Sequence, residues 1–190
     1  EKPPERIVAF DSDSLEILFA IGEGNRIIGT HEFVDYPPET ANIERVGNAF
    51  ALNLEKIVEL EPDLVYIFFD RFVADLENLG LKVLYINSLN NTFQDVMDHF
   101  LLWGQITGNI EAAEEQVAQF QAKLATLEAK LINVTRGPRV YHHTFDFWTP
   151  GGDTLVGRIY ELLKADFVTS EIVGYVQISP EDIVAKDPEV

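Results

Sequence analysis

The feature that most constrains the fold is a near-continuous apolar run, Leu64–Phe69, that begins shortly after Pro62. Pro62 ends any preceding helix, because the residue before a proline avoids the helical region. An apolar run without polar alternation is typical of a strand buried on both faces, as in a parallel sheet. The run therefore predicts an α/β fold, in which helices cover both faces of the sheet.

Shorter apolar strands alternate with helical segments along the chain. Further strands are predicted at Arg6–Phe10, Ile27–Gly29, Val83–Ile86 and Arg139–His143. Helices are predicted at Leu15–Ile21, Asn53–Leu60, Val73–Leu79, Thr92–Gly108 and Leu155–Leu163. This alternation indicates parallel strands joined by right-handed crossovers. Asp13 and Glu16 have the spacing of a capping box at the start of the first helix.

A longer helix is predicted over Ile110–Ile132. Its apolar side chains recur at spacings of four and three residues: Ala113, Val117, Phe120, Leu124, Leu127 and Leu131. This stripe lasts for less than three heptads, so we interpret the helix as a rigid internal element of about 35 Å rather than a coiled coil.

A weak internal repeat aligns Asn53–Asp63 with Ser179–Glu189. Each copy has a capping residue, a Glu two positions later, a central Ile-Val pair and a Pro one residue before its end. The repeat predicts two lobes built alike, each with a capped helix followed by a buried strand; chance similarity is the alternative. Because the sequence ends where the second strand should form, we expect the second lobe to be truncated.

Composition excludes several classes of function. The chain has 14 Lys and Arg against 32 Asp and Glu, a formal net charge of −18, which argues against binding nucleic-acid phosphates. The absence of Cys excludes disulfides, thiolate metal sites and Cys nucleophiles. The acidity favours solubility and is compatible with a basic docking partner.

Seven short motifs occur in a fixed order: Pro4-Glu5-Arg6-Ile7-Val8, Glu16-Ile17-Leu18-Phe19-Ala20-Ile21-Gly22, Asp35-Tyr36-Pro37-Pro38-Glu39, Val46-Gly47, Asn53-Leu54-Glu55-Lys56-Ile57-Val58, Glu61-Pro62-Asp63-Leu64-Val65 and Gln177-Ile178-Ser179-Pro180-Glu181. In this order they resemble the cobalamin and ferric-siderophore class of substrate-binding proteins that serve ABC importers. The resemblance implies two α/β lobes joined by a long rigid helix, with a ligand held in the cleft between them. It divides the chain into an N-terminal lobe (1–108), a linking helix (109–135) and a partial C-terminal lobe (136–190).

The resemblance also indicates the ligand. The Asp35-Tyr36-Pro37-Pro38 loop is most similar to cobalamin binders, and Phe33, Phe68 and Tyr175 match positions that contact the corrin. Phe50 lies beside a fourth such position. A corrinoid such as cobalamin is the expected small-molecule metal chelate, with a ferric siderophore or haem on the same scaffold as alternatives.

Two differences from the class bear on the ligand. Ala49 occupies the fourth aromatic position, which leaves the corrinoid assignment open. The class's Ser-Pro-Ser after the first strand is Asp11-Ser12-Asp13 here, and these carboxylates disfavour an anionic siderophore.

Members of the class dock onto permease arginines through one acidic residue per lobe, and the resemblance places Glu55 and Asp166 at these positions. Without the resemblance, Glu55 is an ordinary first-turn Glu that complements the helix dipole. The resemblance also implies a periplasmic or lipoprotein-anchored location, a permease partner, no cofactor and no enzymatic activity.

An aromatic loop, Phe145-Asp146-Phe147-Trp148, precedes Gly151 and Gly152. It lies between a predicted strand and helix, where α/β sheets place ligand sites, and each aromatic can bury about 150–250 Å². Trp148 is therefore a candidate ligand contact; burial in the core is the alternative. His142 and His143 point to opposite faces of a strand, so only one can reach a given site. We expect His143 to contact a metal chelate rather than to help bind a bare ion with carboxylates such as Asp11, Asp13 and Asp70.

The segment Ile7–Leu15 also resembles the opening motif of haloacid-dehalogenase-type phosphatases. In such an enzyme Asp11 would be the nucleophile and Asp13 the general acid/base, with Mg²⁺ beside them. The later acidic motif is incomplete, because Gly152-Asp153 is not followed by a second Asp. The phosphatase is a distant alternative, as is a purely structural interaction domain.

Overall fold

The computed structural model describes residues 2–48, 50–86 and 91–190. The chain forms two compact units. The first consists of Glu1–Ser88 and Asp98–Ala118, and the second of Leu89–Met97 and Gln119–Val190. Two helices, α4 (Phe93–Thr107) and α5 (Ile110–Leu131), contribute residues to both units.

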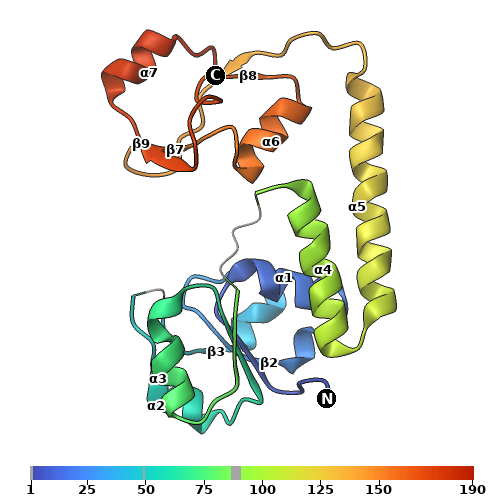
Figure 1. The fold of residues 1–190 in the computed structure, drawn as a ribbon, viewed down its shortest axis with the longest axis vertical. Coiled ribbons are helices and arrows are strands. Elements are labelled where there is room, and N and C mark those ends of the chain that lie inside the picture. The colour runs from blue at the N-terminus through green and yellow to red at the C-terminus, as the bar shows by residue number, and fades with distance from the viewer. Residues whose placement is uncertain (1, 49, 87–90) are drawn as a thin grey trace. The chain divides into compact units, whose positions relative to one another are not determined.

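The first unit is built on a parallel sheet with the strand order β3-β2-β1-β4-β5, which confirms the predicted α/β class (Figure 1). Its strands are β1 (Ile7–Ala9), β2 (Ile27–Thr30), β3 (Glu44–Arg45), β4 (Leu64–Ile67) and β5 (Val83–Tyr85). In the register, Ile7 of the central strand is paired with Leu64 on one side and Ile27 on the other. The two-residue strand β3 was not predicted, because it carries no apolar pattern.

Within its described residues, the first unit contains the predicted α-helices in their predicted order, together with three short 3-10 helices (η) that were not predicted. Besides α4 and α5 they are α1 (Ser12–Ala20), η1 (Gly24–Arg26), η2 (Pro38–Asn42), α2 (Leu54–Glu59), η3 (Asp70–Phe72) and α3 (Val73–Asn78). The capping prediction for α1 was wrong: Asp11, not Asp13, is the N-cap, and its Oδ1 accepts the backbone N–H of Ser14 at 2.7 Å. Asp11 takes this role because it is still extended where the strand ends, whereas Asp13 already lies in the first turn.

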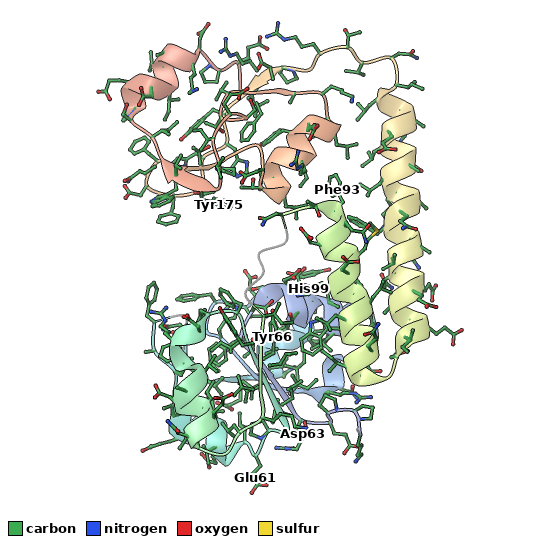
Figure 2. All side chains as sticks on the ribbon, viewed as in Figure 1. Glu61, Asp63, Tyr66, Phe93, His99 and Tyr175 are labelled. Atoms are coloured by element: carbon green, nitrogen blue, oxygen red, sulfur yellow. The ribbon has the colours of Figure 1, made fainter. Side chains whose placement is uncertain are left out.

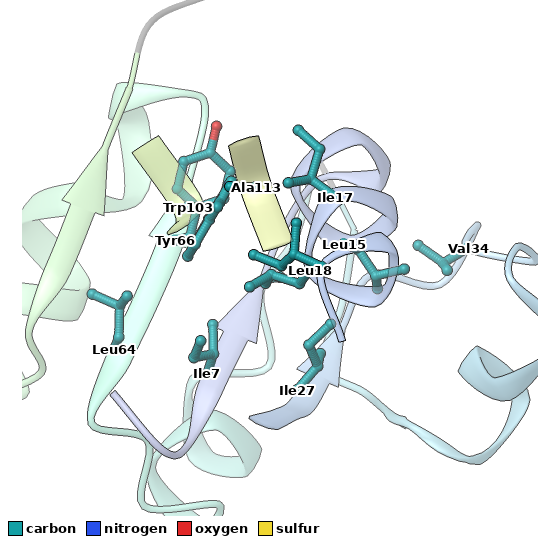
Figure 3. Packing of buried hydrophobic residues seen from close by; sticks show 12 residues of the cluster. Ile7, Leu15, Ile17, Leu18, Ile27, Val34, Leu64, Tyr66, Trp103 and Ala113 are labelled. Carbon is teal, nitrogen blue, oxygen red and sulfur yellow. The ribbon is translucent and has the colours of Figure 1, made fainter. Parts of the chain in front are cut away.

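The two faces of the sheet carry separate apolar cores, as expected for strands buried on both sides. Ile7 and Ala9 point into a cluster with Leu15, Leu18 and Trp103 (Figure 3). The alternate residues Val8 and Phe10 belong to the opposite cluster, with Ile57 of α2 and Leu76 of α3. This period of two explains why the strands are apolar at successive positions.

The second unit contains two small sheets. Strand β6 (Arg139–Val140) pairs in parallel with β8 (Asp166–Phe167), and β7 (Trp148–Pro150) pairs antiparallel with β9 (Tyr175–Gln177). Its further helices are α6 (Leu155–Leu162) and α7 (Pro180–Lys186). The prediction that Trp148 lies in a loop was therefore wrong in part. Trp148 begins strand β7, which forms by pairing with β9, a strand that follows α6 in the chain.

The internal repeat has the same local structure in both copies. Asn53 caps α2 and Ser179 caps α7, each by accepting a backbone N–H three residues on. Each helix is followed by a left-handed residue, Glu61 or Asp187, with φ of 47° in both cases, and then by a proline. The two segments therefore share their cap, helix and proline, whereas the likeness of the two whole lobes stays a prediction.

The repeat extends to the strand pairing that follows each proline. The carbonyl of Arg6 accepts hydrogen bonds from the N–H groups of Asp63 and Leu64 at 2.9 and 3.3 Å. Asp63 is labelled in Figure 2. The carbonyl of Arg139 accepts those of Glu189 and Val190 at 2.8 and 3.1 Å. Val190 thus pairs with β6 as Leu64 pairs with β1.

Helix α5 confirms the long helix predicted from the apolar stripe. Ala113 is fully buried, Phe120 is half-buried and contacts the ring of Phe93 at 6.2 Å, and Leu127 is exposed. Within the described part of the chain, α5 and the other helices are too short or too polar to cross a membrane.

Candidate ligand-binding faces

The first unit gathers several candidate residues at one edge of its sheet. Strand β2, the next strand in the chain, is the neighbour of β1 on one side, and β4 is its neighbour on the other side. The carboxyl ends of such a pair form the crevice in which open α/β sheets bind ligands. Phe68 follows β4 there, and Phe33 follows β2 at the same edge.

Phe50 is linked to Phe68 by way of Arg71 and Phe69. The guanidinium carbon of Arg71 lies 5.7 Å from the ring centroid of Phe50 and 5.2 Å from that of Phe69. Phe69 in turn packs edge-on against Phe68 with a centroid distance of 4.5 Å. The structure therefore brings Phe50 and Phe68 into one aromatic cluster, and Arg71 is a member that the sequence did not reveal.

Phe33 lies on a different loop of this edge and is 71% exposed. Its backbone N–H donates to Nδ1 of His31 at 3.2 Å, and the His31 Nε2 lies 3.1 Å from the hydroxyl of Ser12. Burial, followed by the charge of Arg45, lowers the pKa of His31. The loop carrying Phe33 is thus attached through His31 to the first turn of α1.

Asp11 and Asp13, the two carboxylates after β1, form hydrogen bonds with other groups of this chain. Burial is the largest cause that raises the pKa of Asp11 to about 6. Asp13 lies 2.8 Å from Nδ1 of the buried His99 on α4 (Figure 2). Burial and the nearby Asp11 raise the pKa of Tyr66 on β4. Asp11, Asp13, His99 and Tyr66 therefore form a polar cluster near the carboxyl end of β1.

Within residues 2–48, 50–86 and 91–190, no three His, Asp or Glu side chains are placed so as to hold a metal ion. His31 and Asp13 are each engaged in hydrogen bonds with the chain itself, and His142 lies 3.0 Å from the hydroxyl of Tyr160. The arrangement gives no support to a bare-metal site or to the Mg²⁺ site that a phosphatase requires.

The second unit has its own aromatic face around β7 and β9. Pro150 of β7 pairs with Tyr175 of β9, and Trp148 stacks on Phe145 at a centroid distance of 6.5 Å. Tyr175 is labelled in Figure 2. With Thr144, these aromatics line an open hollow of about 410 Å³. The predicted candidates Trp148 and Tyr175 are therefore brought together.

His143 lies beside this face on the loop before β7. Its Nε2 accepts the backbone N–H of Phe147 at 3.2 Å, and the two rings are 5.8 Å apart. Axial ligation of a metal chelate by Nε2 would break this hydrogen bond. Phe147 has a φ of 60°, in the left-handed region that bulky residues avoid.

The two predicted docking residues differ in their surroundings. Glu55 lies exposed in the first turn of α2. Asp166 instead forms ion pairs with Arg136 at 2.7 Å and Arg139 at 3.8 Å. Glu181 occupies the position in α7 that Glu55 has in α2, and it is also exposed. The repeat register in the sequence was the signal that could have identified Glu181.

The sequence matches known proteins over most of its length. Residues 7–190 match the family model described as periplasmic binding protein. The chain belongs to the periplasmic binding protein family. This is a family of binding proteins and not of enzymes, so Asp11 and Asp13 have no catalytic assignment.

Individual relatives agree with this family. An uncharacterized ABC transporter substrate-binding lipoprotein of Bacillus subtilis, YvrC, is 27% identical over 100% of this chain and 63% of its own length. A vitamin B12-binding protein of Vibrio parahaemolyticus is 26% identical over 100% of the chain and 70% of its own length. The crystal structure of the vitamin B12-binding protein BtuF of Vibrio cholerae superposes with a TM-score of 0.84 at 25% identity, covering 100% of this chain and 76% of that one. The chain thus spans 63% of the length of YvrC.

Proposed function

We propose that the protein containing this chain is the substrate-binding component of an ABC importer and captures a metal chelate, most specifically a corrinoid such as cobalamin. It would act outside the cytoplasmic membrane, in the periplasm or as an anchored lipoprotein, and deliver the chelate to a membrane permease. The observation that carries the proposal is the match of residues 7–190 to the family, together with relatives named for vitamin B12 binding.

The aromatic faces support a flat, largely apolar ligand. The first unit offers Phe33, Phe50 and Phe68, and the second offers Trp148 and Tyr175. Aromatic side chains bury large areas against macrocycles while losing little conformational freedom. We propose that the aromatic side chains of each unit are able to contact such a chelate. A ferric siderophore or haem on the same scaffold is the second candidate.

Tryptophan fluorescence of the full-length protein tests this function. The chain has two tryptophans, and only Trp148 lies at a candidate face, because Trp103 is fully buried. Cyanocobalamin, dicyanocobinamide, haemin and a ferric siderophore would each be titrated into wild type and a Trp148→Phe variant. We expect saturable quenching by a corrinoid in the wild type, and a much smaller change in the variant, which also corrects for absorption by the ligand. Saturation by haemin or the siderophore alone would replace the corrinoid assignment, and no saturation by any of the four would refute the function.

We further propose that Glu55 and Glu181 dock the protein onto the permease, with Glu181 in place of Asp166. The reason is that the repeat gives both residues the same exposed helical position, whereas Asp166 is paired with two arginines of its own chain.

Replacing Glu55 and Glu181 together by alanine is expected to lower transporter-dependent corrinoid uptake by at least about tenfold, because directional carboxylate–arginine contacts are lost. Corrinoid affinity in solution should stay within twofold of wild type. Glu59→Ala, on the same helix as Glu55, is the matched control. Uptake that depends on Asp166 but not on Glu181 would show that the assignment is wrong.

A further inference from the structure

Two exposed phenylalanines have their backbone N–H groups held by histidines, one in each unit. Phe33 donates to Nδ1 of His31, and Phe147 donates to Nε2 of His143, both at 3.2 Å. The rings of each pair also lie close, with centroids 6.4 and 5.8 Å apart. A ring nitrogen accepts a hydrogen bond only when it carries no proton. Both contacts therefore require a neutral imidazole.

The geometry also fixes the tautomer of each histidine. Because Nδ1 of His31 is the acceptor, its proton lies on Nε2 and is directed at the hydroxyl of Ser12 at 3.1 Å. Because Nε2 of His143 is the acceptor, its proton lies on Nδ1. The two histidines thus have opposite tautomers, although they make the same kind of contact.

The hydrogen bond from Phe147 supports a backbone that is unfavourable without it. Asp146 and Phe147 have φ of 45° and 60°, in the left-handed region that residues other than glycine rarely adopt. The same loop leads directly into Trp148. Loss of the His143 acceptor would allow Phe147 to leave this conformation and move the aromatic face with it.

We propose that His31 and His143 are positioning residues: each holds an aromatic loop in its binding conformation only while its imidazole is neutral. The proposal rests on the proposed function, because it gives these loops a role in binding the chelate. It follows that acidification weakens chelate binding, since protonation of His31 removes the acceptor for the N–H of Phe33 and releases that loop.

Other titratable groups surround His31. Burial, followed by the charge of Arg45 on β3, lowers the pKa of His31, so the neutral form persists to lower pH than in a free histidine. Asp11 is next to Ser12 and, with a pKa of about 6, changes charge in the same pH range. Glu32 accepts a hydrogen bond from Asn48. The test must separate His31 from Asp11.

A phenol and a carboxylate lie in the loop segment around His143. The ring of Tyr141 is 6.4 Å away, and burial raises the pKa of that phenol. The carboxylate of Asp146 accepts a hydrogen bond from the side-chain amide of Gln177 on β9. The remaining histidines have other partners, Asp13 for His99 and Tyr160 for His142.

The discriminating variant combines His31→Asn with His143→Gln in the full-length protein. The Asn Oδ1 can replace Nδ1 as an acceptor, and the Gln Oε1 can replace Nε2, but neither titrates. The measured quantity is the ratio of the cyanocobalamin dissociation constants at about pH 5 and about pH 7.5. We expect this ratio to be about five or more in the wild type and within twofold of one in the double variant.

Two further variants complete the design. His31→Phe with His143→Phe keeps the rings but removes both acceptors, so affinity should fall by about fivefold or more at both pH values. His142→Gln is the matched control, because its ring binds Tyr160 and accepts no N–H from a face loop; it should keep the wild-type ratio. A double Asn/Gln variant that keeps the wild-type ratio would assign the pH dependence to another group such as Asp11, and would overturn the proposal.

A ligand-free measurement distinguishes failure of this proposal from failure of the proposed function. Imidazole ¹⁵N spectra should show the Nε2–H tautomer for His31 and the Nδ1–H tautomer for His143 near neutral pH. Any other pair of tautomers would overturn the proposal. If wild type binds no cyanocobalamin, the corrinoid function fails instead, and the spectra still decide whether the histidines hold the two loops.

Discussion

Replacing Trp148 by alanine is expected to weaken binding of cyanocobalamin by about 2 kcal/mol or more, which is at least about thirtyfold in the dissociation constant. Trp148 stacks on Phe145 and lines the same hollow as Tyr175, so its removal takes away the largest flat surface of this face. Isothermal titration calorimetry of the full-length protein measures the change directly.

The control for this prediction is Phe147→Leu, which changes a neighbouring aromatic that does not line the hollow. We expect it to weaken cyanocobalamin binding far less than Trp148→Ala does. Circular dichroism should show that Trp148→Ala leaves the fold intact, because Trp148 is only half-buried. An unchanged affinity in a folded Trp148→Ala protein would remove the β7–β9 face from the binding site.

Replacing Trp103 by alanine is expected to destabilise the first unit by about 3–5 kcal/mol. Trp103 is 0% exposed and meets Tyr66 edge-to-face at 5.3 Å, in the core that β1 shares with α1 and α4 (Figure 3). Truncation leaves a cavity that these packed elements cannot fill. Hydrogen exchange of the β1 and β4 amides reports the free energy of opening of this unit.

A matched control for Trp103 is Leu79→Ala, in the same unit, where the side chain is 47% exposed. The smaller apolar area lost there should cost less than about 1 kcal/mol. Amides in the second unit should exchange as in the wild type in both variants. Similar losses from both substitutions would contradict the view that Trp103 packs in the core of the first unit whereas Leu79 lies at its surface.

The sequence was sufficient for the framework of the protein. The apolar runs Leu64–Phe69 and Arg6–Phe10 predicted a parallel sheet buried on both faces, and the structure forms β4 and β1 within them. Strand periodicity is a local property of the chain, so it can be recognised in the sequence. The capping residues Asn53 and Ser179, with a Pro at the same distance after each, predicted the repeat for the same reason. The ordered motifs also identified the family.

The tertiary structure alone decided how the candidate residues are grouped. The pairing of β7 with β9, which unites Trp148 and Tyr175, joins segments separated by a helix and has no local pattern. The ion pairs of Asp166 with Arg136 and Arg139 likewise depend on β8 lying next to β6.

The same distinction holds for the histidines. Their number and positions are evident from the sequence, but their partners are not: Asp13 reaches His99 only because α4 packs against α1, and Ser12 reaches His31 only because β1 and β2 are adjacent in the sheet. Local patterns determine helices, strands and caps because these depend on neighbours along the chain. Contacts that define a binding face depend on which surfaces pack together, and this is fixed only when the whole core forms.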